Sequence, residues 1–196
     1  MNFTTYADVF CPTAKRSALI YQVSLVMGGS LILALSAQLS FRLPLNPVPF
    51  TAQTLAVTVL GALLGSRRGL ACVLLYLMEG ACGLPVFASG GAGIGYMMGP
   101  TGGYLLGFAA GAWLTGWLAE RGWDKHTGWA IAAMAVGHAV ILICGTVWLS
   151  AILGLGNAIQ MGLYPFLPST VLKLCIGGVM LPAGWKLLKH LKGPLN

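Results

Sequence analysis

Three ionisable side chains, Glu79, His138 and Lys173, stand inside long apolar runs of this chain. A charged group at membrane depth is costly, so each is a functional candidate by default. Lys173 follows "PST" by one helical turn, where its ammonium would reach the mouth of a helix and attract a carboxylate ligand. The alternative is a lysine that snorkels to the membrane surface.

The other two groups allow more than one interpretation. Glu79 lies in "LYLMEGACGLP", near the predicted end of its helix, and either accepts N–H groups of a ligand or pairs with Lys173 or the backbone. His138, in "VGHAV", fits a structural histidine better than a proton relay. Tyr96 and Tyr104 are candidates for the wall of an apolar ligand pocket, and ordinary packing is the alternative.

A glycine-rich stretch, "GGAGIGYMMGPTGGY" (Gly90–Tyr104), invites comparison with nucleotide-binding loops. A dinucleotide fingerprint would need glycine where Tyr96 or Met98 stands, and a P-loop would need a Gly-Lys pair that this stretch lacks. The stretch is therefore not a nucleotide cradle.

Catalytic, metal and nucleic-acid functions find little support. The chain holds only four carboxylates, no HExxH and no GxSxG, so we expect no enzyme. Its five cysteines form no CxxC, which predicts small buried hydrophobes rather than metal ligands. The net charge of +7 comes without a Lys/Arg cluster long enough to follow phosphates. We expect no cofactor, no metal and no nucleic acid.

The elements that position these residues are predicted to be membrane helices. The chain is 57% hydrophobic and 8% charged, against about 25% charged in soluble domains. A cleaved signal peptide is the alternative for the first run, but that run is long enough to span. Residues 1–196 are predicted to form a single all-α integral-membrane domain, with six spans at about 17–41, 52–65, 69–83, 101–119, 128–153 and 169–191.

The basic residues orient these spans. With the N-terminus inside, nine of the eleven Lys and Arg residues fall on the cytoplasmic side. We therefore predict a multi-pass protein of the cell membrane with both termini cytoplasmic. The short second and third spans are predicted to form a helical hairpin joined by a tight "GSRRG" turn.

The three outer connections are rich in Gly and Pro, and each precedes a helix that runs inward. The predicted cap signatures are Pro49-Phe50-Thr51, Pro100-Thr101 and Pro168-Ser169. Three positive helix ends on one side favour a vestibule for a polar or anionic ligand from outside. Compact turns without a ligand are the alternative for any one loop.

Four segments together resemble the BioY family, the biotin-specific S-components of energy-coupling-factor (ECF) transporters. They are "PLNPVPFTAQTLAVTVLGALLGSRRG", "GLPVFASGGAG", "GPTGGYLLGF" and "PFLPSTVLK". The resemblance implies the six-helix S-component fold and a protein that binds biotin from outside. It also implies partners in an ECF module, namely a membrane coupling protein and ATPase subunits.

The resemblance also carries over site residues. Lys173 matches the family lysine, whereas Thr170 stands where many members have Asp. The resemblance implies that this Asp accepts the ureido N–H groups of biotin. In this chain that role passes to Glu79 or to the Thr170 hydroxyl. The glycine-rich loop then resembles a lid, in which Gly91 and Gly93 would let the backbone approach the ring of biotin closely.

Partner docking is predicted on the first helix. Small residues let membrane helices approach closely, and the chain offers a mostly small stripe there: Gly29, Ser30, Ala34, Ala37 and Gln38. Packing against the protein's own helices is the alternative. For function as a whole, the alternatives are an integral-membrane enzyme and a self-sufficient secondary transporter of a small carboxylated metabolite.

Overall fold

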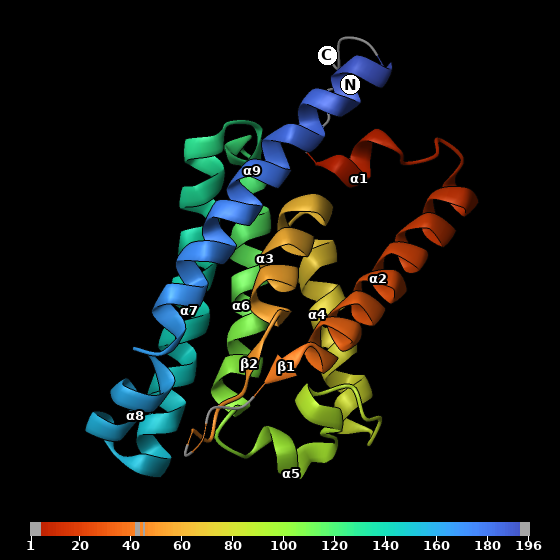
Figure 1. Ribbon diagram of the computed structural model, residues 1–196. Helices are drawn as coiled ribbons and strands as arrows, with labels where there is room; N and C mark the ends of the chain where they lie inside the picture. Colours follow the sequence, from red (N-terminus) through yellow and green to blue (C-terminus); the bar gives the residue numbers. More distant parts are fainter. Residues whose placement is uncertain (1–4, 42–43, 45, 193–196) are drawn as a thin grey trace.

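The computed structural model describes residues 5–41, 44 and 46–192, and long helices dominate it (Figure 1). The six long helices are α2 (Lys15–Gln38), α3 (Gln53–Leu64), α4 (Ser66–Ala81), α6 (Gly102–Ala119), α7 (Thr127–Leu153) and α9 (Phe166–Lys192). The shorter elements are α1 (Tyr6–Val9), β1 (Ser40–Phe41), β2 (Phe50–Thr51), η1 (Ala88–Gly90), α5 (Gly93–Met97), η2 (Trp123–Lys125) and α8 (Leu155–Gly162).

These six helices agree with the predicted spans to within a few residues at each end, and the all-α membrane fold is confirmed. Three of them, α2, α7 and α9, are long and apolar enough to cross a membrane. By contrast, α3 has 12 residues and α4 has 16. The six-span count and the cytoplasmic placement of the termini stay predictions.

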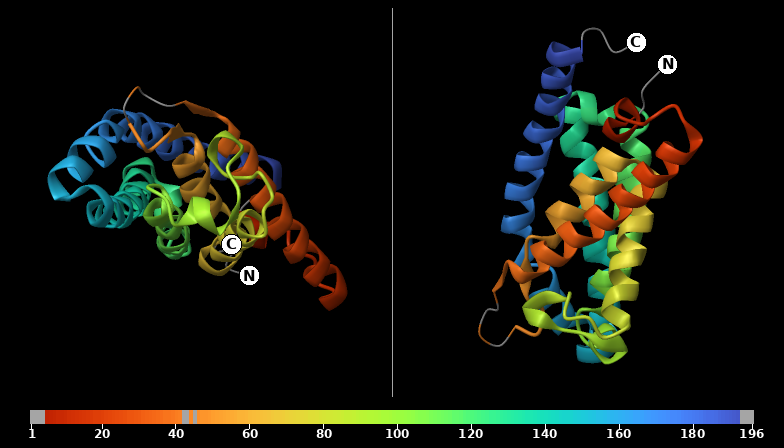
Figure 2. Two further views of the ribbon diagram at one scale, coloured as in Figure 1. Left: turned by 90° about the horizontal axis from the view of Figure 1, so that it is seen from below. Right: turned by 90° about the vertical axis from the view of Figure 1, so that its right-hand side faces the viewer.

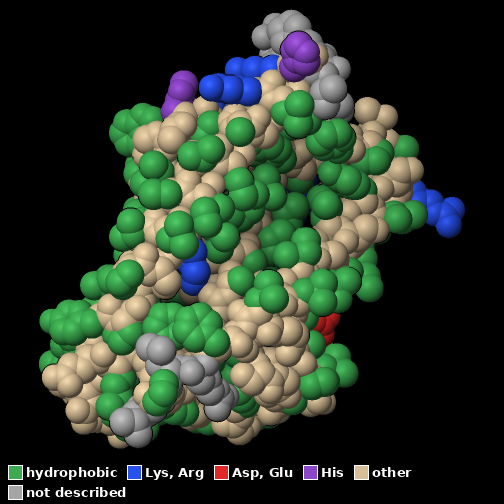
Figure 3. All heavy atoms as spheres, in the orientation of Figure 1, with side chains coloured by type: hydrophobic (Ala, Val, Ile, Leu, Met, Phe, Trp, Pro, Cys, Tyr) green, Lys and Arg blue, Asp and Glu red, His purple; other side chains and the backbone are tan. Residues whose placement is uncertain are grey.

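The helices form one bundle with two different ends (Figures 1 and 2). One end carries α1, η2 and the last turns of α9, and Lys and Arg side chains gather there (Figure 3). The opposite end carries the antiparallel β1–β2 pair together with η1, α5 and α8. The N-termini of α3, α6 and α9 all point to this second end, as predicted.

Two details of the prediction need correction. The "GSRRG" segment is not a turn, because Ser66 already begins α4 and Gly65 alone, at φ 86°, links it to α3. Helix α9 begins at Phe166, so Pro168 and Ser169 lie inside its first turn rather than ahead of it. A proline fits there because the first N–H groups of a helix have no intrahelical acceptor.

Close packing of α6 on α7 depends on glycines that face the partner helix. A Cβ at Gly103 would lie 2.2 Å from the Trp148 Cβ and 2.5 Å from the Cys144 carbonyl. One turn further along α6, a Cβ at Gly107 would lie 3.0 Å from the Ile141 Cα. Without these glycines the two backbones would have to separate, which would widen the bundle next to the site described below.

The predicted docking stripe of α2 faces the protein's own helices. Ser30 and Ala37 are fully buried, and a Cβ at Gly29 would lie 2.5 Å from the Cys72 sulfur of α4. Ala34 packs against the core, while the Gln38 amide donates to the Phe87 carbonyl at 3.3 Å. Gly29, Ser30 and Ala37 thus pack internally, whereas Ala34 is half-buried and Gln38 is exposed, and partner docking on this stripe stays a prediction.

At the end that carries the termini, Asp124 of η2 contacts Trp185 of α9, and Trp185 in turn contacts α1. Its side chain is fully buried in η2, and the Trp185 indole of α9 donates to its Oδ2 at 2.5 Å. The Tyr6 ring of α1 packs on Trp185 with centroids 4.4 Å apart. Burial raises the pKa of the Asp124 carboxyl from 3.8 to about 6. The other carboxylate oxygen, Oδ1, has no hydrogen bond to any described residue.

Candidate functional site

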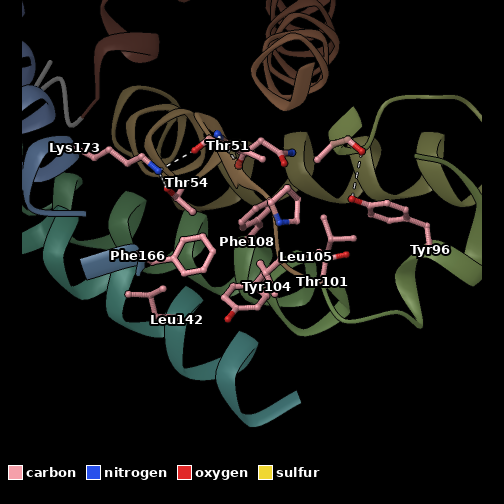
Figure 4. A pocket seen from close by; sticks show the side chains of 14 residues that line it. Thr51, Thr54, Tyr96, Thr101, Tyr104, Leu105, Phe108, Leu142, Phe166 and Lys173 are labelled. Atoms are coloured by element: carbon pink, nitrogen blue, oxygen red, sulfur yellow. Dashed lines mark hydrogen bonds between the residues drawn. The ribbon is translucent and has the colours of Figure 1, made fainter. Parts of the chain in front are cut away.

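A pocket opens among α3, α6 and α9 near the β1–β2 end of the bundle, with about 500 Å³ of space including the part open to solvent. Its lining comes from several elements far apart in the sequence (Figure 4): Val48, Pro49, Thr51, Gln53, Thr54, Ala88, Tyr96, Thr101, Tyr104, Leu105, Phe108, Leu142, Phe166 and Lys173.

Lys173 is the only charged side chain among these lining residues. Its ammonium donates to the Thr51 carbonyl and to the Thr54 hydroxyl, both at 2.8 Å, and is thereby held against the start of α3 (Figure 4). An ammonium carries three N–H donors, so one stays available for a ligand. A cation fixed in a mostly apolar pocket is suited to bind a carboxylate.

Gln53 is a polar lining residue that the sequence analysis missed. It is buried at the first position of α3, and its amide nitrogen donates to the Tyr76 hydroxyl at 2.7 Å. Tyr76 in turn donates to the Val86 carbonyl at 3.2 Å. This chain fixes the Gln53 amide and leaves its Oε1 without a donor among the described residues. The Oε1 atom is therefore available to accept an N–H group of a ligand.

Two of the rings that line the pocket, Phe166 and Tyr104, are held in place by contacts with residues outside the lining. Phe50 of β2 stacks on Phe166 of α9 with centroids 4.3 Å apart, and Phe41 of β1 stacks on the other side at 5.0 Å. The Tyr104 ring lies 6.1 Å from Phe166, and its hydroxyl donates to the Gly162 carbonyl at 2.6 Å. The short strands thus add a hydrophobic cover above the start of α9.

Three of the predicted binding residues, Lys173, Tyr96 and Tyr104, line the pocket. Tyr96 lies at the end of the pocket away from Lys173, and its hydroxyl donates to the Ala88 carbonyl at 3.4 Å (Figure 4). Gly91 lies behind that ring, because a Cβ there would be 2.3 Å from the Tyr96 Cε2. Gly91 therefore supports the pocket wall and is not itself part of the lining.

The remaining candidates lie elsewhere. Gly93 opens α5 at φ 83° with no atom near its missing Cβ, and Thr170 stands one turn before Lys173 outside the lining. Glu79 accepts a 2.5 Å hydrogen bond from Ser30 between α4 and α2. His138 is buried in α7, where its Nδ1 lies 3.0 Å from the Met134 carbonyl, in keeping with the structural interpretation.

Comparisons with known proteins agree with this architecture. The BioY family profile matches residues 12–190. The biotin transporter BioY of Rhizobium etli is 35% identical over 159 residues, covering 77% of this chain and 85% of that protein. The biotin transporter BioY of Thermotoga maritima is 37% identical over 139 residues, covering 70% of this chain and 81% of that protein.

A solved structure has the same fold. The crystal structure of the S-component for biotin from an ECF-type ABC transporter matches with a TM-score of 0.78 at 22% identity, covering 89% of this chain and 95% of that one. The fold is therefore that of this S-component, and the matching family and relatives place the chain in a class of membrane transport proteins. Within that class, this chain belongs to the BioY family.

Proposed function

We propose that this chain is the substrate-binding membrane component of a biotin uptake transporter, and that it captures biotin at the extracellular side. The observation that carries the proposal is the fixed ammonium of Lys173, the one charged group in an otherwise uncharged pocket lining that includes four aromatic side chains. Biotin joins a carboxylate, a flexible apolar chain and a bicyclic ring with a ureido group. The pocket offers a matching group for each part.

The proposed assignment follows the chemistry of the lining. The Lys173 ammonium binds the carboxylate through a charge-assisted hydrogen bond. The Gln53 Oε1 accepts a ureido N–H, the role that the family resemblance implies for the Asp found in many members in place of Thr170. The lining rings of Phe108, Phe166 and Tyr104 cover the apolar chain and ring.

Energy for accumulation has to come from partners. The sequence holds no P-loop, and the proposed partners are the membrane coupling protein and ATPase subunits of an ECF module. The proposed contact with the coupling protein is the accessible part of the α2 stripe, at the half-buried Ala34 and the exposed Gln38.

Calorimetric titration of the purified chain with biotin tests the proposal. We expect saturable binding, with the biotin recovered chemically unchanged by mass spectrometry. Conversion of biotin into a product would instead support the membrane-enzyme alternative. Accumulation of biotin against a gradient in proteoliposomes that contain this chain alone would support the self-sufficient transporter.

A further inference from the structure

A second cavity lies outside the biotin pocket, between α2 and α4 at the end that carries the termini. The axis of α2 leans away from that of α4 toward the first residues of α2 (Figure 1), and the groove lies between these two helices. It holds about 930 Å³ of space, including the part open to solvent. Its lining is mostly apolar and ends in two arginines: Leu19, Gln22, Val23, Val26, Met27, Arg67, Arg68, Ala71 and Leu75.

A polar basin adjoins the groove and shares Gln22, Arg67 and Arg68 with it. The basin has about 880 Å³ of space, again with its open part included. The other residues of the basin are mainly polar: Thr5, Asp8, Leu64, Ser66 and Glu120. The two cavities together make an apolar groove with a hydrophilic end. Such a groove is complementary to an amphiphilic ligand, which has an apolar tail and a polar head.

The charges at this junction favour an anionic amphiphile. Arg68 is paired with Asp8 at 2.9 Å, and Glu120 accepts from the backbone and hydroxyl of Ser66 at 2.7 and 2.8 Å. Arg67 is exposed and has neither a hydrogen bond nor an ion pair with any residue in the described part of the chain. Lys15 and Arg16 begin α2 one turn before Leu19 of the groove lining and add positive charge at this end of the helix.

We propose that this groove binds an anionic phospholipid of the phosphatidylglycerol type. Its acyl chains lie along Val23, Met27 and Leu75, and its phosphate pairs with Arg67 at the polar basin. Clusters of Lys and Arg at the cytoplasmic surface attract anionic lipids, at about 1 kcal/mol for each basic residue. An apolar helix of a partner protein in the same groove would leave the unpaired Arg67 without a counter-charge.

The test uses the full chain in nanodiscs of equimolar phosphatidylglycerol and phosphatidylcholine. Native mass spectrometry measures which lipid stays bound after release. Arg67→Ala removes the proposed phosphate contact, and Lys189→Ala is its control, since Lys189 is exposed on α9 at the same end. Val23→Trp fills the groove, and Ile20→Trp is its control, since Ile20 is an exposed α2 residue outside the lining.

We expect the wild type to retain phosphatidylglycerol in preference to phosphatidylcholine. Arg67→Ala should lower that preference about fivefold, and Val23→Trp should abolish retention of both lipids, while the two controls keep it. The biotin affinity and melting temperature of every variant should match those of the wild type. Equal retention of both lipids by the wild type would overturn the proposal, as would a preference that survives Arg67→Ala or a groove occupied by a second copy of the chain.

Discussion

The Lys173 ammonium of α9 lies 2.8 Å from the Thr54 hydroxyl of α3, and this hydrogen bond spans 119 residues of sequence. It holds the cation at the pocket wall before a ligand arrives. Because the ammonium is already directed by Thr51 and Thr54, little side-chain entropy is left to lose when a carboxylate binds. We therefore propose that ligand recognition depends on the contact between α3 and α9, the second and the last of the six long helices.

Glu79 should be dispensable for binding. Because its carboxylate lies against Ser30 and outside the pocket lining, Glu79→Gln should leave the biotin dissociation constant within about twofold of wild type. Isothermal titration measures this directly. A loss of tenfold or more would return Glu79 to the binding site.

Gln53 should contribute to biotin affinity through its side-chain oxygen, Oε1. Gln53→Leu removes the proposed acceptor for a ureido N–H, and a hydrogen bond of about 1 kcal/mol corresponds to roughly a fivefold loss of affinity. Tyr76→Phe is the matched control, because it removes the partner of the Gln53 nitrogen and keeps the Oε1 atom. An equal loss in both variants would show that the pair acts only by supporting the pocket wall.

Gly103 should be required for stability. Gly103→Ala places a Cβ 2.2 Å from that of Trp148, and overpacking of this kind costs about 1–3 kcal/mol. Gly128→Ala near the start of α7 meets no atom within 4 Å and should be neutral or stabilising. Melting temperatures in detergent compare the two. An unchanged value for Gly103→Ala would contradict the close α6–α7 contact.

Asp124 should make stability depend on pH. Its pKa in the folded protein is about 6, above the ordinary 3.8, so the folded state binds this proton more tightly than the unfolded state does. The resulting stabilisation is fully present below about pH 4 and is lost as the pH rises through about 6. As the pH rises from about 4 to about 7, the melting temperature of the wild type should therefore fall more steeply than that of Asp124→Asn. Identical slopes would show that the carboxyl does not titrate as described.

The helices could be predicted because a chain in lipid must satisfy its backbone hydrogen bonds within each segment. Long apolar runs separated by Gly, Pro and charged residues therefore mark helices almost residue by residue. The prediction failed at two helix starts, where a residue that often breaks helices lies inside the first turn: Gly69 in α4 and Pro168 in α9. Ser66–Gly69 looked like a turn because of its two arginines, yet those side chains reach the polar end of the bundle from within α4.

The pocket could be predicted only in part. Lys173 stood out because a cation in an apolar run is rare, and Tyr96 and Tyr104 stood out as aromatic residues beside helix starts. Gln53 gave no such signal, because its role depends on Tyr76, a residue 23 positions away on another helix. The stripe of α2 was ambiguous for a related reason. Small residues permit close helix packing whether the neighbouring helix belongs to the same chain or to a partner.

The most direct test of the account compares biotin with biotin amide on wild type and Lys173→Met. The amide lacks the carboxylate, so only biotin should depend on the ammonium. A charge-assisted hydrogen bond of about 1.5–3 kcal/mol predicts a ten- to hundredfold loss of biotin affinity in Lys173→Met, with biotin amide nearly unaffected. Equal losses for both ligands, or no loss for either, would contradict the assignment of Lys173 to the carboxylate.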